Sequence, residues 1–377
     1  MRKLEELIIS KPATELKRIV VKIGSSSLTS LHGEISRKKL EKLVEQLVKL
    51  KDNGYEVLLV SSGAVAAGYR KLGFLERPKS LPEKQAAASI GQGLLMEAYS
   101  DLFLSHGYVA SQILITRGDF SDETRYNNVR NTINVLVDRG IIPIINENDT
   151  VTVDRLRFGD NDTLSAKVAG LVGADFLAVL SDIDGLYTDN PAKNPEATRI
   201  ELVEAITAEI EAAAGDAGSA IGTGGMKSKL DAFKIAMASG IKGFLGEATA
   251  EDIIYRSVLG DAEGTYFEAS EDIDSLNRKK QWIAFNSGPV GEIIIKNINQ
   301  SPILINLSDI QTVKGNFKKG DVVRIQNEAG ERIGLGIVNQ DASELWQALA
   351  SPVKNMEETI VDQEAFVCEL DHTVPIQ

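Results

Sequence analysis

The sequence predicts an α/β protein: a three-layer αβα sandwich with a mainly parallel central sheet, followed by a small β-rich domain. Over the first two-thirds of the 377-residue chain, apolar runs of strand length alternate with segments whose apolar residues recur every three or four positions. Continuous apolar strands separated by helices indicate a buried parallel sheet with helices on both faces. From residue 278 onward, short strands follow one another between Gly and Asn turns, which is typical of a small β domain.

The elements of the first domain, placed at residues 1–272, follow in order. Residues 18–24 (RIVVKIG) form the first predicted strand, and Ser36 begins a helix that Asn53 and Gly54 end. The other predicted strands are 56–61, 109–116, 141–145 and 176–180, and the other predicted helices are 84–104, 122–138, 165–171 and one ending at Ala238. In such sheets ligands bind outside the carboxyl ends of the strands, so the residues that follow each strand are the first candidates for a site.

The second domain, placed at residues 278–377, contains predicted strands at 292–296, 322–326 and 332–337 and a helix at 342–349. Gly and Asn turns separate the strands, which is why this part reads as β-rich.

Composition restricts the chemistry. The chain has 54 Asp and Glu against 41 Lys and Arg, a net charge of −13, which argues against general nucleic-acid binding, although the body of the small domain is mildly basic. The single cysteine, Cys368, can form neither an internal disulfide nor a cysteine metal site, and three His make a histidine cage improbable. No apolar run reaches the length of a membrane span, and the first residues lack the apolar core of a signal peptide, so we expect a cytoplasmic protein. Its chemistry must come from Asp, Asn, Ser, Lys and the backbone.

The first two strands end in small residues. After the first strand, Lys22 stands beside Gly24 and Ser25, which offers a cation, backbone N–H groups and hydroxyls suited to phosphate oxygens. An ordinary strand-to-loop turn with a partly exposed Lys is the alternative. No GxxxxGK[ST] motif occurs, so the chain has no P-loop. The second strand ends in VSSGAVAAG (60–68), where small residues allow a ligand close to the backbone, although this segment by itself favours the alternative of a tight helix–sheet contact.

Two polar segments follow the fourth strand: PIINEND (143–149) and, ten residues later, GDNDT (159–163). Carboxylates and amides can bind an ammonium group or orient cationic side chains around a phosphoryl group. The alternative is a set of turns and helix caps, with Asp162 and Thr163 capping the next helix. Two such segments beside the ends of sheet strands favour a site over a cap.

Residues 180–187 (LSDIDGLY) end the fifth strand, and GTGGMKSK (222–229) leads into a helix. A Gly-rich turn that precedes a helix, with Lys229 one turn in, suits a phosphate, although a solvated loop is the alternative.

Together these segments resemble the amino-acid kinase family, and within it the glutamate 5-kinases. The matching pieces are VVKIGSSSL (20–28), VSSGAVAAG (60–68), PIINEND (143–149), FGDNDTLSA (158–166), LSDIDGLYT (180–188) and GTGGMKSK (222–229). Residues 278–377 resemble the PUA domain that bacterial glutamate 5-kinases often carry, notably in NRKKQWIAF (277–285) and KGNFKKGDVVRI (314–325).

The resemblance implies that the γ-phosphoryl group of ATP is transferred to the side-chain carboxylate of L-glutamate in the first step of proline biosynthesis. It implies catalytic roles for Lys22, Asp162 and Lys229, and glutamate binding by Ser62, Asp149 and Asn161. The implied nucleotide-binding set is Lys22, Gly24, Ser25, Ser181, Asp182, Thr223, Gly224, Gly225, Met226, Lys227, Ser228 and Lys229. Mg²⁺ would be carried mainly by the ATP phosphates, with no metal site built by the protein alone. Inhibition by proline and a homodimer or homotetramer are also implied.

Some positions depart from the family pattern. Ser181 and Ser228 stand where the family more often has Thr, and a hydroxyl group is kept. Lys227 adds a second cation to the nucleotide loop, so the choice between Lys227 and Lys229 for the phosphate contact stays open. Residues 301–311 also depart, which leaves the role of the small domain open.

Three alternatives remain. The chain could be a sister kinase for another small carboxylate, an RNA-binding or RNA-modifying protein in which the PUA-like domain contacts RNA, or chiefly a sensor of an amino acid. The loops of the first domain suit phosphates and a small substrate and lack interleaved aromatic and Arg residues, which favours a kinase.

Overall fold

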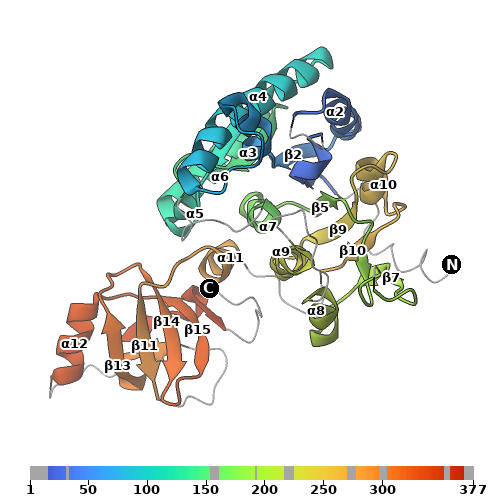
Figure 1. Ribbon diagram of the computed structural model, residues 1–377. Coiled ribbons are helices and arrows are strands. Elements are labelled where there is room, and N and C mark those ends of the chain that lie inside the picture. The colour runs from blue at the N-terminus through green and yellow to red at the C-terminus, as the bar shows by residue number, and fades with distance from the viewer. Residues whose placement is uncertain are drawn as a thin grey trace. The chain divides into compact units, whose positions relative to one another are not determined.

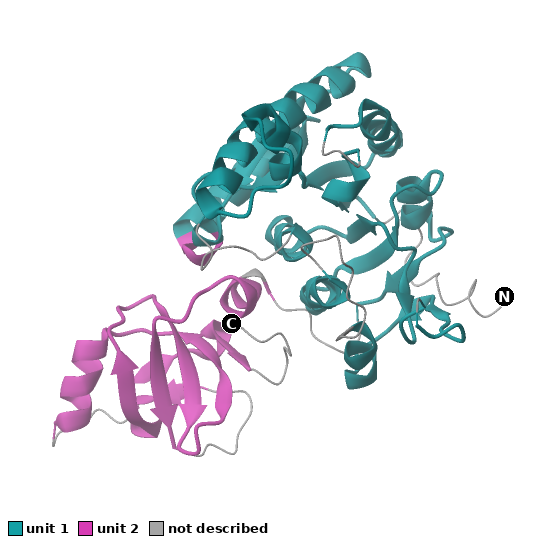
Figure 2. Cartoon of the chain, viewed as in Figure 1, with its two compact units in different colours: residues 1–119, 124–274 teal, residues 120–123, 275–377 magenta. Residues whose placement is uncertain are grey.

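The structure is a computed structural model, and it describes residues 16–30, 34–152, 161–191, 193–215, 225–269, 277–296, 304–351 and 357–368. It divides into two compact units (Figure 2). Unit 1 comprises Met1–Asp119 and Thr124–Asp274, and unit 2 comprises Ser275–Gln377 together with the short segment Phe120–Glu123.

Unit 1 contains a large sheet with the strand order β3-β4-β2-β1-β5-β9-β10-β8, of which Figure 1 labels β2, β5, β9 and β10. Each neighbouring pair in it is parallel except β9 with β10, which confirms the predicted α/β class. The strands are β1 (Arg18–Ile23), β2 (Glu56–Ser61), β3 (Ala110–Ile115), β4 (Ile142–Glu147), β5 (Phe176–Ser181), β8 (Leu202–Val203), β9 (Lys242–Glu247) and β10 (Thr265–Phe267), with β6 (Leu186–Tyr187) and β7 (Arg199–Ile200) forming a separate pair.

The helices of unit 1 connect these strands. The α-helices are α2 (Arg37–Asp52), α3 (Ala64–Gly68), α4 (Leu81–Ser105), α5 (Arg117–Ser121), α6 (Glu123–Asp138), α7 (Asn161–Val172), α8 (Ala208–Gly215), α9 (Met226–Ala238) and α10 (Ile253–Leu259). Two short 3-10 helices, η2 (Ser25–Ser27) and η3 (Tyr69–Leu72), follow β1 and α3. The predicted positions of the first five strands are confirmed, whereas α7 begins at Asn161 and not at residue 165.

The two faces of the sheet are covered by different helices, and this decides where Lys22 points. Ile19, Val21 and Ile23 belong to a buried cluster that also contains apolar residues of α2, α4 and α10. Successive side chains of a strand point to opposite faces. Val20 and Lys22 are also buried, and they therefore face the other side of the sheet, where α7 contacts β1. The alternation along β1 thus directs the Lys22 side chain toward α7.

Glycines allow α3 and α4 to approach each other closely. A Cβ added at Gly68 would lie 1.9 Å from the carbonyl oxygen of Ala87, and one at Gly91 would lie 1.8 Å from that of Ala64. The VSSGAVAAG segment therefore makes a tight helix–helix contact, and Ala64 and Ala67 of the same segment also belong to the buried cluster that contains residues of β1 and β2. Gly63, with φ of +100°, provides the left-handed turn between β2 and α3.

Unit 2 contains a five-stranded sheet in the order β13-β11-β14-β15-β17 around a core of Ile, Val, Leu and Phe residues. Its elements are α11 (Arg278–Phe285), β11 (Gly291–Ile295), β12 (Ile305–Asn306), η5 (Leu307–Asp309), β13 (Ile310–Gly315), β14 (Val322–Asn327), β15 (Arg332–Ile337), α12 (Ala342–Ala350), β16 (Thr359–Val361), η6 (Gln363–Ala365) and β17 (Phe366–Cys368). The predicted β-rich character is confirmed. Within this unit the Trp282 indole N–H donates to the carbonyl oxygen of Phe120 at 2.9 Å.

Candidate active site

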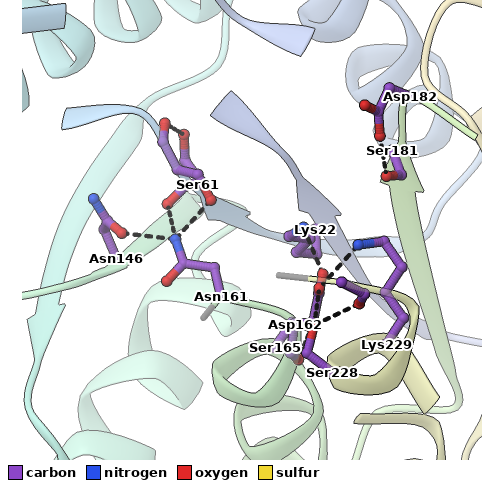
Figure 3. Close-up of polar contacts among 12 residues, drawn as sticks. Lys22, Ser61, Asn146, Asn161, Asp162, Ser165, Ser181, Asp182, Ser228 and Lys229 are labelled. Carbon is purple, nitrogen blue, oxygen red and sulfur yellow. Dashed lines mark hydrogen bonds and ion pairs between the residues drawn. The ribbon is translucent and has the colours of Figure 1, made fainter. Parts of the chain in front are cut away.

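Three charged side chains from three elements meet on the α7 face of the sheet (Figure 3). Lys22 comes from β1, Asp162 from the first turn of α7, and Lys229 from the first turn of α9. Lys22 Nζ lies 2.5 Å from Asp162 Oδ1, and Lys229 Nζ lies 3.2 Å from Asp162 Oδ2. The carboxylate side chain is 1% exposed and the two lysine side chains are 8% and 7% exposed. Two cations share one anion, so the cluster carries a net positive charge and favours a further anion beside it.

The two ammonium groups determine the protonation of Asp162. Burial by itself raises the pKa of this carboxyl group, because desolvation disfavours the charged form. The positive charges of Lys22 and Lys229 and their hydrogen bonds outweigh that effect and hold the pKa below its ordinary value. Asp162 is therefore an anion at neutral pH, and its two oxygens lie against the ammonium groups of the two lysines.

The first turn of α9 adds a hydroxyl group to the cluster. Ser228 Oγ lies 3.1 Å from Asp162 Oδ2 and 2.9 Å from the carbonyl oxygen of Gly225. Among the described residues, a Cβ added at Gly225 would meet no atom within 4 Å. Lys227 is exposed, in contrast to the buried Lys229, and Met226 is the first residue of the helix. The other predicted residues of this loop, Thr223 and Gly224, lie outside the described residues.

The loop after β1 lies next to Lys22. A Cβ added at Gly24 would stand 3.9 Å from Lys22 Nζ, so the backbone of this loop passes beside the ammonium group. Ser25 begins η2, and Lys39 Nζ on α2 donates to the carbonyl oxygens of Ser26 within η2 and of Thr29 beyond it, both at 2.8 Å. Within the loop, the N–H groups of Ser27 and Leu28 donate to the carbonyl oxygens of Gly24 and Ser25 at 3.2 Å and 3.1 Å.

The end of β5 contributes Ser181 and Asp182. The Ser181 hydroxyl donates to Asp182 Oδ1 at 2.9 Å. In the sheet Ile23 pairs with Leu180 on one side and with Ser61 on the other, so the ends of β5, β1 and β2 lie side by side. The sequence-predicted residues at these three strand ends therefore line one edge of the sheet.

A neutral network lies one residue away from the charged cluster. Asn161, which precedes Asp162, donates its side-chain N–H groups to the carbonyl oxygen of Ser61 at 2.8 Å, to Ser62 Oγ at 2.8 Å and to Asn146 Oδ1 at 2.9 Å (Figure 3). The end of β2, the end of β4 and the start of α7 are thereby joined by one amide. Asp149 lies two residues beyond β4, half-buried, in a turn where its N–H donates to the carbonyl oxygen of Glu147 at 3.0 Å.

Several contacting residues were missed at the sequence level. Asn146 lies within the INEND segment and could have been singled out as the amide that follows a buried strand. Ser61 lies within the VSSGAVAAG segment but was not singled out, and Lys39 and the α4 residues Gln92 and Tyr99 carried no local signal, because only their contacts in the folded chain give them a place at the site.

The described part of the chain contains no group of three or more His, Cys, Asp and Glu side chains placed to hold a metal ion. Among the same residues, no helix has the length and apolar character that crossing a membrane requires.

Comparison with known proteins agrees with this geometry. The model of the amino acid kinase family matches residues 17–246, and that of the PUA domain matches residues 308–359. The chain belongs to the amino acid kinase family. It is 66% identical to glutamate 5-kinase 2 of Bacillus subtilis (strain 168), with 97% of this chain and 99% of that protein covered. It is 65% identical to glutamate 5-kinase 2 of Bacillus licheniformis, with 96% and 99% covered.

A solved structure supports the same fold. Carbamate kinase from Giardia lamblia bound to AMP-PNP superimposes with a TM-score of 0.50 at 17% identity, covering 68% of this chain and all of that one. Membership of the amino acid kinase family makes the chain an enzyme of phosphoryl transfer. The charged cluster and the neutral network both lie at the same edge of the large sheet of unit 1.

Proposed function

We propose that the chain transfers the γ-phosphoryl group of ATP to the side-chain carboxylate of L-glutamate, giving L-glutamyl 5-phosphate and ADP as the first step of proline biosynthesis. The observation that carries the proposal is the position of Asn161 and Asp162 at the start of α7. These neighbours join a neutral network suited to an amino-acid substrate to a cationic cluster suited to phosphate. The high identity to two Bacillus glutamate 5-kinases supports glutamate as the acceptor.

The chemistry needs no general base. The acceptor carboxylate, with a reference pKa of about 4.3, is already ionised at neutral pH. One of its oxygens bonds to the γ-phosphorus as the bond to the ADP oxygen breaks, and ADP leaves with the electron pair. The obstacle is repulsion between two anions and the charge that spreads over the transferring group. Lys22 and Lys229 meet that requirement as fixed cations, and Asp162 keeps them in place.

The other predicted residues take supporting roles. Gly24 and Ser25 offer N–H groups to phosphate oxygens, and Ser62, Asn161 and Asp149 bind glutamate, with the Asp149 carboxylate suited to the α-ammonium group. Ser181, Asp182 and the loop that includes Thr223–Lys229 hold the nucleotide. Burial of Lys229 against Asp162, with Lys227 exposed, supports Lys229 as the lysine at the transferring phosphoryl group.

Magnesium fits this site only as a companion of the nucleotide. Both Asp162 oxygens lie against lysine ammonium groups, which leaves that carboxylate little capacity for a cation. Mg²⁺ bound to the ATP phosphates and water would neutralise phosphate charge, as it does when few protein ligands are present.

The decisive experiment measures glutamate-dependent ADP release and traps the acyl phosphate as a hydroxamate with hydroxylamine. Aspartate, N-acetylglutamate and carbamate serve as alternative acceptors in the same assay. The proposal expects hydroxamate with glutamate and little with the others. Turnover of another acid in preference to glutamate would replace the proposal with the sister-kinase alternative.

Feedback inhibition by proline and a homodimer or homotetramer are part of the proposal and rest on the resemblance to glutamate 5-kinases. Adding proline at millimolar concentrations to the assay tests the first, and light scattering on the purified chain tests the second. An RNA contact by the PUA domain stays a prediction. Two of the cations in that domain, Lys314 and Arg324, pair with the same carboxylate, Glu292, at 3.9 Å and 3.3 Å.

A further inference from the structure

Helix α4 carries three polar side chains at seven-residue intervals: Gln85, Gln92 and Tyr99. Seven residues make close to two helical turns, so side chains at this spacing lie on one face of a helix. Each of the three makes a hydrogen bond to a different segment of unit 1, and each of those segments carries or contacts a residue of the proposed glutamate site.

The middle contact reaches Asn161 through one intermediate. Asn146 donates its side-chain N–H to Gln92 Oε1 at 2.9 Å, and its Oδ1 accepts from Asn161 at 2.9 Å. Gln92 in turn donates to Gln112 Oε1 at 3.0 Å. All the donors in this chain of amides point the same way, so the oxygen of Gln92 fixes the orientation of Asn146, and Asn146 fixes that of Asn161. The Asn161 oxygen is thereby turned away from the network (Figure 3) and is suited to accept from an ammonium group.

The contact made by Tyr99, nearest the C-terminal end of α4, holds the end of β2. The hydroxyl groups of Tyr99 and Ser61 lie 3.0 Å apart, and the Tyr99 side chain is fully buried. Burial raises the pKa of the Tyr99 hydroxyl above its ordinary value, so it stays protonated and can donate. Ser61 precedes Ser62, and its carbonyl oxygen accepts from Asn161. Tyr99 therefore fixes the strand end from which Ser62 projects.

The contact made by Gln85, nearest the N-terminal end of α4, holds the turn that follows β4. Gln85 Nε2 donates to the carbonyl oxygen of Thr152 at 3.1 Å. The Thr152 hydroxyl and N–H both reach back to the carbonyl oxygen of Asn148, at 2.8 Å and 3.2 Å, which closes the turn around Asp149. Gln85 therefore holds the turn that presents Asp149.

We propose that Gln85, Gln92 and Tyr99 are positioning residues for the acceptor substrate, and that α4 sets the affinity for glutamate without touching it. The proposal rests on the proposed function, because it takes glutamate as the ligand. It makes α4 a common support for the end of β2, for Asn146 in β4 and for the turn that follows β4, so one face of one helix aligns Ser62, Asn161 and Asp149. The nucleotide side of the site lies on other elements, β1, β5 and α9, and the hydrogen bonds of the three residues described above go to β2, β3, β4 and the turn after β4.

The test is steady-state kinetics of Gln92→Met, with glutamate varied at saturating ATP and ATP varied at saturating glutamate. Loss of the oxygen acceptor frees the Asn146 amide, so the KM for glutamate should rise roughly 5–20-fold, the loss expected for one well-placed hydrogen bond. The KM for ATP should stay within about twofold. Gln92→Glu retains an oxygen acceptor and should restore most of the affinity for glutamate. Tyr99→Phe and Gln85→Met should show the same selective change with smaller size.

A matched control comes from Gln46 on α2. Its side-chain oxygen accepts the N–H of Ile254 at 2.9 Å, so it also joins a helix to another segment of unit 1. Gln46→Met should lower the melting temperature and leave both KM values unchanged. If Gln92→Met behaves like this control, or raises both KM values equally, the residues of α4 are structural and the inference is wrong. If the wild-type chain itself releases no ADP with glutamate, the proposed function fails and the inference fails with it, a result distinct from an active enzyme with an indifferent Gln92.

Discussion

The charged and neutral halves of the site are held in place by different means. In the charged half, Lys22, Asp162 and Lys229 contact one another directly, and each comes from a separate element whose packing places it. In the neutral half, Asn161 and Ser62 are aligned from behind, through Asn146 and the side chains of α4. The two halves meet at Asn161 and Asp162, which are consecutive residues of α7. The different ways in which they are held in place therefore do not result from a large separation between the halves.

Electrostatics explains the difference. A buried charge costs several kcal/mol unless an opposite charge compensates it, so the charged half must be self-sufficient. A buried amide needs only hydrogen-bond partners, each with a net value of about 1 kcal/mol, and these can be supplied in series by a helix. Loss of one member of the charged half should therefore cause a large drop in stability or in kcat. Loss of one hydrogen bond in the neutral half should cause only a small change in the KM for glutamate.

The largest effect is expected for Asp162→Asn. The substitution leaves two buried ammonium groups facing a neutral amide, and breaking a buried ion pair costs about 3–5 kcal/mol in the free energy of unfolding. Urea denaturation at pH 7 measures this loss. In the double variant Lys22→Met, Asp162→Asn, one uncompensated cation is gone, so it should be more stable than Asp162→Asn alone. A double variant that is less stable would contradict this account of the cluster.

A comparison of wild type with Asp162→Asn also tests the pKa of Asp162. Its pKa in the folded chain lies below the ordinary value of about 3.9, so its ionised form stabilises the fold above that pH and the stabilisation is lost as pH falls through the folded pKa. The stability difference between wild type and Asp162→Asn should thus be constant between about pH 6 and pH 8 and shrink below about pH 4. A difference that grows on acidification would have the wrong sign.

A second large effect is expected for Lys22→Ala on catalysis. Removing one fixed electrostatic group from a transition state lowers kcat by about 10²–10³ in comparable sites. ADP release with saturating glutamate and ATP measures the loss. Lys42→Ala, which removes an exposed lysine of α2, is the control and should be active like wild type. An unchanged kcat in Lys22→Ala would remove the role proposed for Lys22.

Much of this architecture could be predicted from local patterns. Apolar runs precede Lys22 in β1, Ser62 after β2 and Asn146 in β4, and the polar segments at these strand ends mark the edge of the sheet where the candidate site lies. Strand β9 (KGFLGE) was not predicted, because Gly243 and Gly246 interrupt the apolar run. A Cβ at Gly243 would lie 2.6 Å from the Phe233 ring, so this glycine is dictated by a contact from α9 that the local sequence does not reveal.

The candidate site shows the same limit. Lys22, Asp162 and Lys229 could be named from their motifs, but the alternation of β1 and the start of α7 at Asn161 are what bring them together. The α4 contacts could not be found locally, since a Gln inside a helix is ordinary and only its partner at Asn146 gives it a role. The residues proposed to bind substrate lie in recognisable motifs, whereas the residues proposed to align them do not.

Effects of intermediate size and opposite sign on stability are expected for alanine substitutions at two glycines of α4, Gly91 and Gly93. In Gly91→Ala the new methyl group would lie 1.8 Å from the carbonyl oxygen of Ala64, so α3 and α4 must separate, at a cost of about 1–3 kcal/mol. Because α4 then shifts from the neutral half, the KM for glutamate should rise. Gly93→Ala lies two residues further on the same helix, where a Cβ meets nothing within 4 Å, and should stabilise the chain by about 0.5–1 kcal/mol. Thermal unfolding of both variants gives the two signs, and equal destabilisation would contradict the close helix contact.

The smallest effect is expected for Lys39→Met, which tests whether the charged half depends on residues outside it. Lys39 is outside the cluster, yet its ammonium group binds the carbonyl oxygens of Ser26 and Thr29 and so supports the loop beside Lys22 from behind. Lys39→Met should loosen that loop and raise the KM for ATP about two- to fivefold, with the KM for glutamate unchanged, because two partly exposed hydrogen bonds are lost and no buried charge is stranded. Lys38→Met, the exposed neighbour, is the control and should change neither value. A loss of kcat as large as that of Lys22→Ala would place Lys39 within the charged half, and the division between a self-sufficient half and a supported half would no longer hold.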